Sequence, residues 1–428
     1  MNARTVLVTG DGGAGRTTAA AATAVRSARR GTRTLLLTGD HGPDDHGFRL
    51  HGTDPGAADA HGLGSLLGHT VPAGRPVEVE PGLAVHRFGP RPGADDPAAL
   101  THFAAELLGT RPLDPEEFTA LPGAAETALL RALREHVADP RWDLVVVDCP
   151  PLPVTLTALA LPERLHRHLD RLLPAERRAA RALHPLLAAV AGAPVPPERL
   201  YEVAGRVRAA VAAARTVVED NATTVHLVLP PQRAAQALRR ARPALALFGH
   251  RLEALLVNQV LPTGSGDPWL AALSARQRDG IEALRTAGLP VRELPHLGRE
   301  PAGRDDLAAL GAGLAVAPRP PGPAAEPWTV LPSGADAHGA DAHGADVHGA
   351  EEGQFTWRLP LPGAERSDLH LVRRDDELVV DLGPYRRILP LPAVLRRCTA
   401  AGASVRDGAL LVRFTPDPGL WPRRRTVG

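Results

Sequence analysis

The feature that most restricts the fold of this chain is a glycine-rich turn between an apolar strand and a helix. Residues 5–9 read Thr-Val-Leu-Val-Thr and predict a buried β-strand. Residues 10–15 follow with four glycines, and the alanine-rich stretch 17–30 has high helix propensity. Residues 34–38 form a second apolar run. Because parallel strands covered on both faces have such continuous apolar runs, the sequence predicts a βαβ unit.

The loop has the spacing of a phosphate-binding motif with one substitution. Residues 10–17 fit the pattern G-x-x-x-x-G-K-[ST], except that arginine stands in place of the lysine. In this motif the backbone N–H groups of the turn and of the helix N-terminus hold phosphate oxygens, and the threonine hydroxyl is a Mg²⁺ ligand. Arginine keeps the charge but is planar and bulkier, so the exchange is not conservative. We therefore expect a nucleotide site made of Gly12, Gly13, Ala14, Gly15, Arg16, Thr17 and Thr18.

The glycine run also invites comparison with short-chain dehydrogenases, whose turn has the pattern G-x-x-x-G-x-G. That spacing fails, because Ala14 and Arg16 fall where glycines belong. The Tyr-x-x-x-Lys pair of those enzymes cannot exist in this chain either, because it contains no lysine. We reject this interpretation.

Composition excludes several classes of partner. Lys+Arg total 49 and Asp+Glu 48 in 428 residues, so no basic surface for nucleic acid is expected. Cys149 and Cys398 are far apart in sequence and form neither a disulfide framework nor a metal-binding pair. No leader and no apolar run of about 18 residues is evident. We expect a cytoplasmic protein without a membrane span.

The pattern of apolar runs predicts the domain organisation. We expect an α/β domain over residues 1–318, in which 143–148 form the clearest strand and 164–219 a helical insert. A disordered Pro/Gly-rich linker with GADAH repeats is expected over 319–354. Short alternating runs separated by turn residues predict a small β-sandwich over 355–416, followed by a tail, 417–428.

These stretches resemble one family in order. Residues 6–18 resemble the deviant Walker A loop of the ArsA/Get-type ATPases, which include the arsenite-efflux ATPase and the targeting factor for tail-anchored membrane proteins. Further stretches resemble the family's switch I, switch II, adenine-reading strand and EP-x-G turn, and they are residues 36–40, 148–163, 257–262 and 300–303. Residues 359–362 and 383–390 resemble a small-heat-shock-protein-like domain appended to many bacterial members. The resemblance implies a P-loop NTPase fold: a mostly parallel sheet flanked by helices, with a helical insert and a small C-terminal β-sandwich.

The resemblance also implies roles for individual residues. Asp40 would position the attacking water, Asp148 would hold Mg²⁺ through a water molecule together with Thr17, and Asn258 would read adenine. ATP and Mg²⁺ are the implied cofactors. Both acids also have a simpler interpretation, Asp40 as a solvated acid at a strand end and Asp148 as a loop acid.

The departures from the family fall on the residues that drive hydrolysis. The two loop lysines of the family are Asp11 and Arg16 here, and Pro153-Val154 replaces the Gly-His of switch II. The clustered cysteines of the arsenite site, the zinc-binding Cys-x-x-Cys and the methionine-lined groove are all missing. Two functions therefore stay open. One is a pseudo-ATPase that acts as a regulatory or heterodimer partner of a paralogue that has both lysines. The assembly implied by the resemblance is a homodimer or such a heterodimer. The other function is an active Mg²⁺-dependent ATPase coupled to an unidentified cargo or transport partner. The separate losses favour the first.

Overall fold

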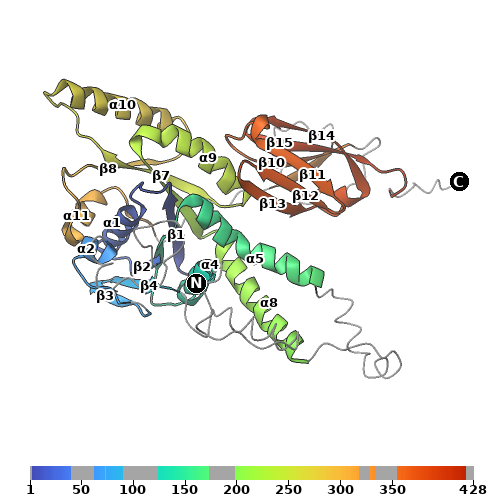
Figure 1. Cartoon of the computed structure of the whole chain (residues 1–428), viewed down its shortest axis with the longest axis horizontal. Helices are drawn as coiled ribbons and strands as arrows, with labels where there is room; N and C mark the ends of the chain where they lie inside the picture. The colour runs from blue at the N-terminus through green and yellow to red at the C-terminus, as the bar shows by residue number, and fades with distance from the viewer. Residues whose placement is uncertain are drawn as a thin grey trace, which may run out of the picture. The chain divides into compact units, whose positions relative to one another are not determined.

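The computed structural model describes residues 2–39, 62–72, 74–89, 124–172, 198–317, 328–332 and 354–420. The chain divides into two compact units (Figure 1). The first comprises Met1–Ala234 and Glu253–Gly322, and the second comprises Ala235–Leu252 and Pro323–Gly428.

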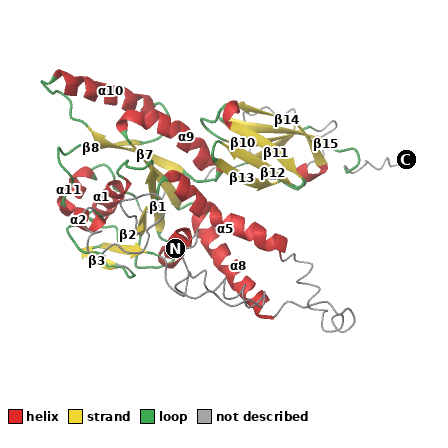
Figure 2. Ribbon diagram, in the orientation of Figure 1, coloured by secondary structure: helices red, strands yellow, loops and turns green. Residues whose placement is uncertain are grey.

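The first unit is built on an eight-stranded sheet in the order β3-β4-β2-β5-β1-β6-β7-β8. Strands are yellow in Figure 2, which labels β1, β2, β3, β7 and β8 of this sheet. Its pairs β1–β5, β1–β6, β2–β4, β2–β5 and β7–β8 are parallel, and β3 is antiparallel to β4. The mostly parallel α/β sheet expected from the sequence is thus confirmed. The strands are β1 Arg4–Gly10, β2 Thr34–Gly39, β3 Val77–Glu80, β4 Leu83–Phe88, β5 Leu144–Asp148, β6 Thr223–Leu229, β7 Leu252–Val260 and β8 Val291–Pro295.

Helices cover both faces of this sheet. Helices α1 Arg16–Ala28, α2 Leu63–Leu67 and α11 Gly303–Leu310 lie together on one face, where they share a core with inward side chains of the sheet (Figure 1). A second group, which contacts β1, β2 and β4, consists of α4 Ala124–Val137, α5 Leu152–Leu172 and α8 Glu198–Val218. Helix α10 Pro268–Arg285 connects β7 to β8. The alanine-rich face of α1 allows close packing on the sheet, because Ala19–Ala22 are all fully buried.

The second unit contains two small antiparallel sheets and helix α9, Ala234–Leu247. One sheet has the order β14-β15-β10-β9 and the other β11-β12-β13, as expected for a small sandwich. Arg387 of β13 donates to the carbonyl of Leu247 at the end of α9, at 2.5 Å, and lies over the ring of Phe248. The strands are β9 Thr329–Pro332, β10 Phe355–Pro360, β11 Leu369–Arg374, β12 Glu377–Leu382, β13 Tyr385–Pro390, β14 Cys398–Arg406 and β15 Ala409–Pro416.

One segment differs from the expectation. Residues 329–332, which we expected within a disordered linker, form β9 and pair with β10. Thr-Val-Leu is a run of good strand formers, and its backbone groups find partners on the open edge of β10. The GADAH repeats, Asp40, the middle of the expected helical insert and the end of the tail lie outside the described residues.

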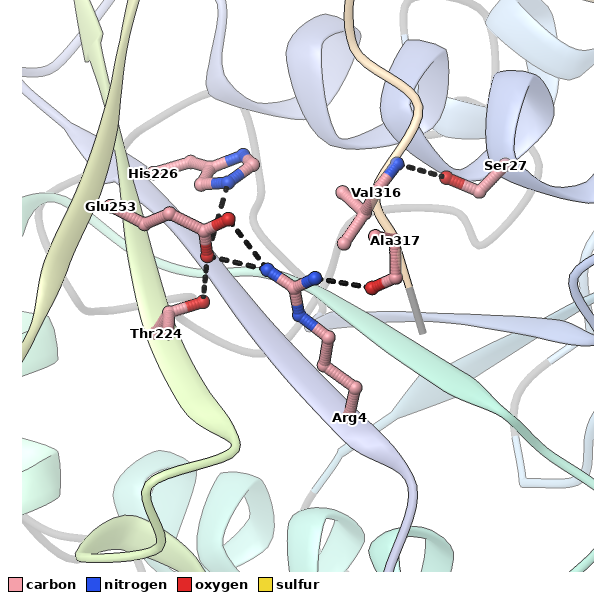
Figure 3. Close-up of polar contacts among 7 residues, drawn as sticks. All are labelled: Arg4, Ser27, Thr224, His226, Glu253, Val316 and Ala317. Atoms are coloured by element: carbon pink, nitrogen blue, oxygen red, sulfur yellow. Dashed lines mark hydrogen bonds and ion pairs between the residues drawn. The ribbon is translucent and has the colours of Figure 1, made fainter. Parts of the chain in front are cut away.

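A buried ion pair joins four segments at the amino ends of the central strands (Figure 3). Arg4 of β1 donates two hydrogen bonds of 2.6 Å to the carboxylate of Glu253 on β7, and another to the carbonyl of Ala317. Thr224 of β6 donates to the same carboxylate at 2.6 Å, and Nε2 of His226 is 3.8 Å from it. The cluster therefore ties the last described residues of the first unit to the sheet.

Candidate functional site

The glycine loop lies at the carboxyl end of β1, between this strand and α1. Gly13 and Gly15 have φ values of 75° and 84°, a left-handed conformation that glycine adopts without a steric cost. Gly15 is the N-cap of α1, and no side chain caps this helix. The first turn of α1 therefore presents its backbone N–H groups, whose charge distribution favours an anion.

The loop is held tightly against neighbouring strands. A Cβ atom added to Gly10 would lie 2.2 Å from the carbonyl oxygen of Val228 on β6. A Cβ added to Gly15 would lie 2.0 Å from Nδ2 of Asn258 on β7. At Gly10 a side chain would meet the backbone of Val228, and at Gly15 it would need a positive φ and a shift of the Asn258 amide, so both positions favour glycine.

Asn258 of β7 holds the loop through a hydrogen bond to its backbone. Its Nδ2 donates to the carbonyl of Ala14 at 3.0 Å, and the residue is 7% exposed. Asn258 also lines a cavity of about 340 Å³, together with Gly15, Thr18, Gln259, His296 and Pro301. A volume of this size lies at the lower end of the range of small-molecule sites. The expected role of Asn258 in reading adenine stays a prediction, and part of its amide group is already engaged with the loop.

Arg16 reaches across the loop to the segment after β5. Its Nη1 donates to the carbonyl of Cys149 at 2.7 Å. The backbone N–H of Cys149 in turn donates to the carbonyl of Val8, at 3.0 Å. The side chain at the lysine position is thus bound to the segment that follows β5, a contact that the motif alone does not predict.

Asp148 lies at the end of β5, between β1 and β2. It is 1% exposed, pairs in register with Val8 and Thr38, and accepts a hydrogen bond of 3.1 Å from the hydroxyl of Thr38. A carboxylate oxygen is a hard ligand of the kind that Mg²⁺ prefers. The donor set of Asp148 and the Thr17 hydroxyl therefore fits such an ion in its chemistry.

The segment that follows β5 is anchored by two threonines. The hydroxyls of Thr9 and Thr155 both donate to the carbonyl of Pro150, at 2.8 and 2.7 Å. Pro153 lies in the first turn of α5, where a proline is tolerated because its missing N–H would have no helical partner. The replacement of the family's glycine at this position is therefore compatible with the helix.

The cysteines, possible metal-binding clusters and possible membrane spans were also examined in the described residues. Cys149 and Cys398 are both free and buried, and burial raises the pKa of the Cys149 thiol far above its usual range. Within the described ranges, no group of three or more His, Cys, Asp and Glu residues could hold a metal ion. No helix in the described part of the chain is long and apolar enough to cross a membrane.

The site brings together most of the residues expected from sequence. Asn258 contacts the loop residues Gly12–Thr18 through the carbonyl of Ala14. Arg16 connects the loop to Cys149, the residue next to Asp148. Asp11 is exposed in the loop. His296 was missed: it lines the cavity, and its Nδ1 accepts a hydrogen bond from the N–H of Gly298. The one signal in the sequence that could have indicated His296 is its position just before the EP-x-G turn, residues 300–303.

The sequence of this chain was also compared with known proteins. Residues 3–44 and 102–315 match the family model of anion-transporting ATPases, and residues 352–414 match an HSP20-like domain found in ArsA. An uncharacterized protein of Streptomyces coelicolor is 48% identical over 99% of this chain and 100% of its own length. A protein of Mycobacterium tuberculosis is 34% identical over 98% of both chains. A putative arsenical pump-driving ATPase of Aquifex aeolicus is 21% identical over 96% of this chain and 99% of its own.

Proposed function

Because the chain belongs to the anion-transporting ATPase family and carries its HSP20-like domain, we propose that it is a nucleotide-binding pseudo-ATPase. It acts as a regulatory or heterodimer partner of a paralogue that has both loop lysines, and a homodimer is the alternative assembly. The backbone N–H groups of residues 12–18 would hold the phosphates of ATP. Thr17 and Asp148 would hold Mg²⁺, which neutralises phosphate charge when bound.

The contact between Arg16 and Cys149 carries this proposal. In an active phosphate loop the basic side chain supplies a compact charge between the terminal phosphates. Here the guanidinium is bound to the carbonyl of Cys149 at 2.7 Å, so phosphates must compete with that carbonyl for it. The planar guanidinium of Arg16 also points its N–H groups in fixed directions, whereas the ammonium group of a lysine can rotate its donors.

The exposed carboxylate of Asp11 supports the same conclusion. Unit charges about 8 Å apart interact by roughly 2 kcal/mol at an effective dielectric of 20, before screening by salt. Asp11 therefore opposes the binding of a triphosphate next to the loop. The backbone cradle still favours an anion, so we expect weakened binding rather than none.

The test measures binding and turnover separately. Purified protein is titrated with a fluorescent ATP analogue and Mg²⁺, and phosphate release is followed at saturating ATP. We expect binding, with a release rate no higher than that of an Asp148→Asn variant. The double variant Asp11→Lys, Arg16→Lys should bind ATP more tightly. No binding by the unmodified protein would overturn nucleotide binding, and turnover abolished by Asp40→Ala would overturn the pseudo-ATPase.

An active ATPase is the second candidate. The position of Asp148 favours it, because this buried acid lies at the end of the strand next to the loop, where a Mg²⁺ ligand is needed. In that case hydrolysis would be coupled to an unidentified cargo or transport partner. Turnover by the unmodified protein would distinguish this function from the first.

A further inference from the structure

The four-stranded sheet of the sandwich is completed by a strand from outside the HSP20-like domain. That domain's match begins at residue 352, whereas β9 spans Thr329–Pro332. β9 runs antiparallel to β10 and forms one edge of the sheet. Its residues are half-buried or exposed. β9 therefore lies on β10 in the way that an added peptide strand lies on an open sheet edge.

An aromatic anchor precedes this strand. The ring of Trp328 packs edge-to-face on Trp357 of β10, with centroids 6.0 Å apart, and the guanidinium of Arg387 lies 5.2 Å from the ring. Val330 pairs with Trp357, which is fully buried. Because side chains alternate along a strand, Trp328 and Val330 share the face toward the core. The edge of β10 thus holds the pattern Trp-x-Val.

The connection between β9 and β10 does not require them to pair within one chain. A tight hairpin needs two to five connecting residues. Here residues 333–354 join Pro332 to Phe355, and a connection of that length can span up to roughly 70 Å. The same strand could therefore reach the equivalent edge of a second copy with no change in its own contacts.

We propose that residues 328–332 are an exchangeable strand that binds the β10 edge of a second copy of this chain. Each copy offers one strand and one β10 edge, so a reciprocal exchange links two copies and leaves neither β10 edge open. Because exchange creates no new contacts, its extent depends on the local concentration of the second edge. When a strand and its edge are joined by a linker, the competing effective concentration is of the order of millimolar. A dimer of the ATPase region would supply that concentration, and to this extent the inference rests on the proposed function.

Two cysteine variants of the full-length chain test the exchange directly. Leu331 and Thr356 are paired across β9 and β10, and both are half-buried on the face opposite the core. Residues paired in this way lie close enough for a disulfide. Leu331→Cys protein is mixed with Thr356→Cys protein, oxidised mildly and analysed on non-reducing gels. Only a strand of one chain on the edge of another can join the two variants, and we expect a covalent dimer linking positions 331 and 356.

Three controls make the result decisive. A single chain with both substitutions must form the disulfide, which shows that the geometry permits it. A mixture of Leu331→Cys with Arg374→Cys, an exposed residue of β11, measures random collision. The native Cys149 and Cys398 are buried and do not compete. A mixed dimer well above the collision control supports the exchange, and a yield equal to it overturns the exchange.

Measuring the mass of the unmodified protein in solution distinguishes failure of the strand exchange from failure of the dimer in the proposed function. A monomeric mass overturns both the exchange and a homodimer, whereas it does not bear on a heterodimer with a paralogue. A dimeric mass without the mixed cross-link overturns the exchange alone. Adding Trp328→Ala to the Leu331→Cys chain should lower the mixed yield several-fold, and an unchanged yield overturns the anchoring role of Trp328.

Discussion

Removal of the buried Arg4 should destabilise the first unit far more than removal of an exposed arginine that makes a similar ion pair elsewhere. Arg4 is 2% exposed, and both oxygens of Glu253 accept from its Nη2 at 2.6 Å. Arg4→Met leaves that carboxylate buried without its cation. Breaking a buried ion pair in this way costs about 3–5 kcal/mol. That is a large share of the roughly 5–15 kcal/mol that stabilises a whole domain.

Arg33 provides the matched control. It makes a similar two-pronged contact with Asp143, but its side chain is 56% exposed. An exposed pair of this kind contributes about 0–1 kcal/mol. Urea denaturation followed by circular dichroism should give a loss for Arg4→Met that exceeds the loss for Arg33→Met by about 3 kcal/mol. Equal losses would refute the reasoning, because burial would then not determine the cost.

The double variant Arg4→Met, Glu253→Leu sharpens the prediction. Replacing both charges with apolar groups removes the desolvation penalty together with the attraction, so its stability should lie closer to the wild type than that of either single variant. Hydrogen exchange should also locate the effect. The Arg4→Met variant should lose protection at Val316, whose N–H donates to Ser27, because the bond to the neighbouring Ala317 carbonyl is gone.

The pH dependence of the same pair has a defined sign. Burial alone would raise the pKa of Glu253, but His226 and the hydrogen bonds from Arg4 and Thr224 outweigh it and hold this pKa well below its usual range. The pair's contribution is therefore fully present above the unfolded pKa of about 4.3 and is lost as pH falls through the lower folded value. The stability difference between wild type and Glu253→Gln should shrink as pH falls below about 4, through the lowered folded pKa of Glu253.

Three further predictions concern the loop and its surroundings. Asp11→Asn should tighten binding of an ATP analogue about threefold to tenfold at low salt and less at high salt, and an affinity independent of salt would contradict the electrostatic argument. Gly15→Ala should abolish that binding because its Cβ meets Nδ2 of Asn258, whereas Gly31→Ala, which has a similar φ but nothing within 4 Å, should bind normally. Cys149 should resist a thiol reagent until the protein unfolds, since burial raises its pKa, and rapid labelling of the native protein would show that its surroundings open.

Much of the first unit could be predicted because its signals are local. The strands at 4–10, 34–39 and 144–148 are continuous apolar runs, and the glycine spacing fixes the turn between the first strand and α1. Both patterns depend on residues that are close in sequence. The order of the eight strands was not predicted, because it depends on pairing between strands that are distant in sequence. The right-handed preference of parallel crossovers restricts only the face on which each connecting helix lies.

Contacts between distant residues could not be predicted in the same way. Arg4 and Glu253 are far apart in sequence, and nothing around either residue indicates its partner. The same holds for Arg16 and the carbonyl of Cys149, because a backbone acceptor leaves no mark in the sequence. β9 was missed because four strand-forming residues are too short a signal within a segment rich in proline and glycine. Its partner strand decides its conformation.

The structure also determines which loop residues can inform on activity. Gly10 and Gly15 are required by the backbone path, since a Cβ at either would clash with Val228 or Asn258. They are therefore needed to fold the loop, whether or not ATP is hydrolysed, and their presence is no evidence for hydrolysis. Asp11 is exposed, so packing does not select its side chain. Its charge is accordingly the more informative feature, and a site that must gather the charge of a triphosphate has no reason to place a carboxylate there.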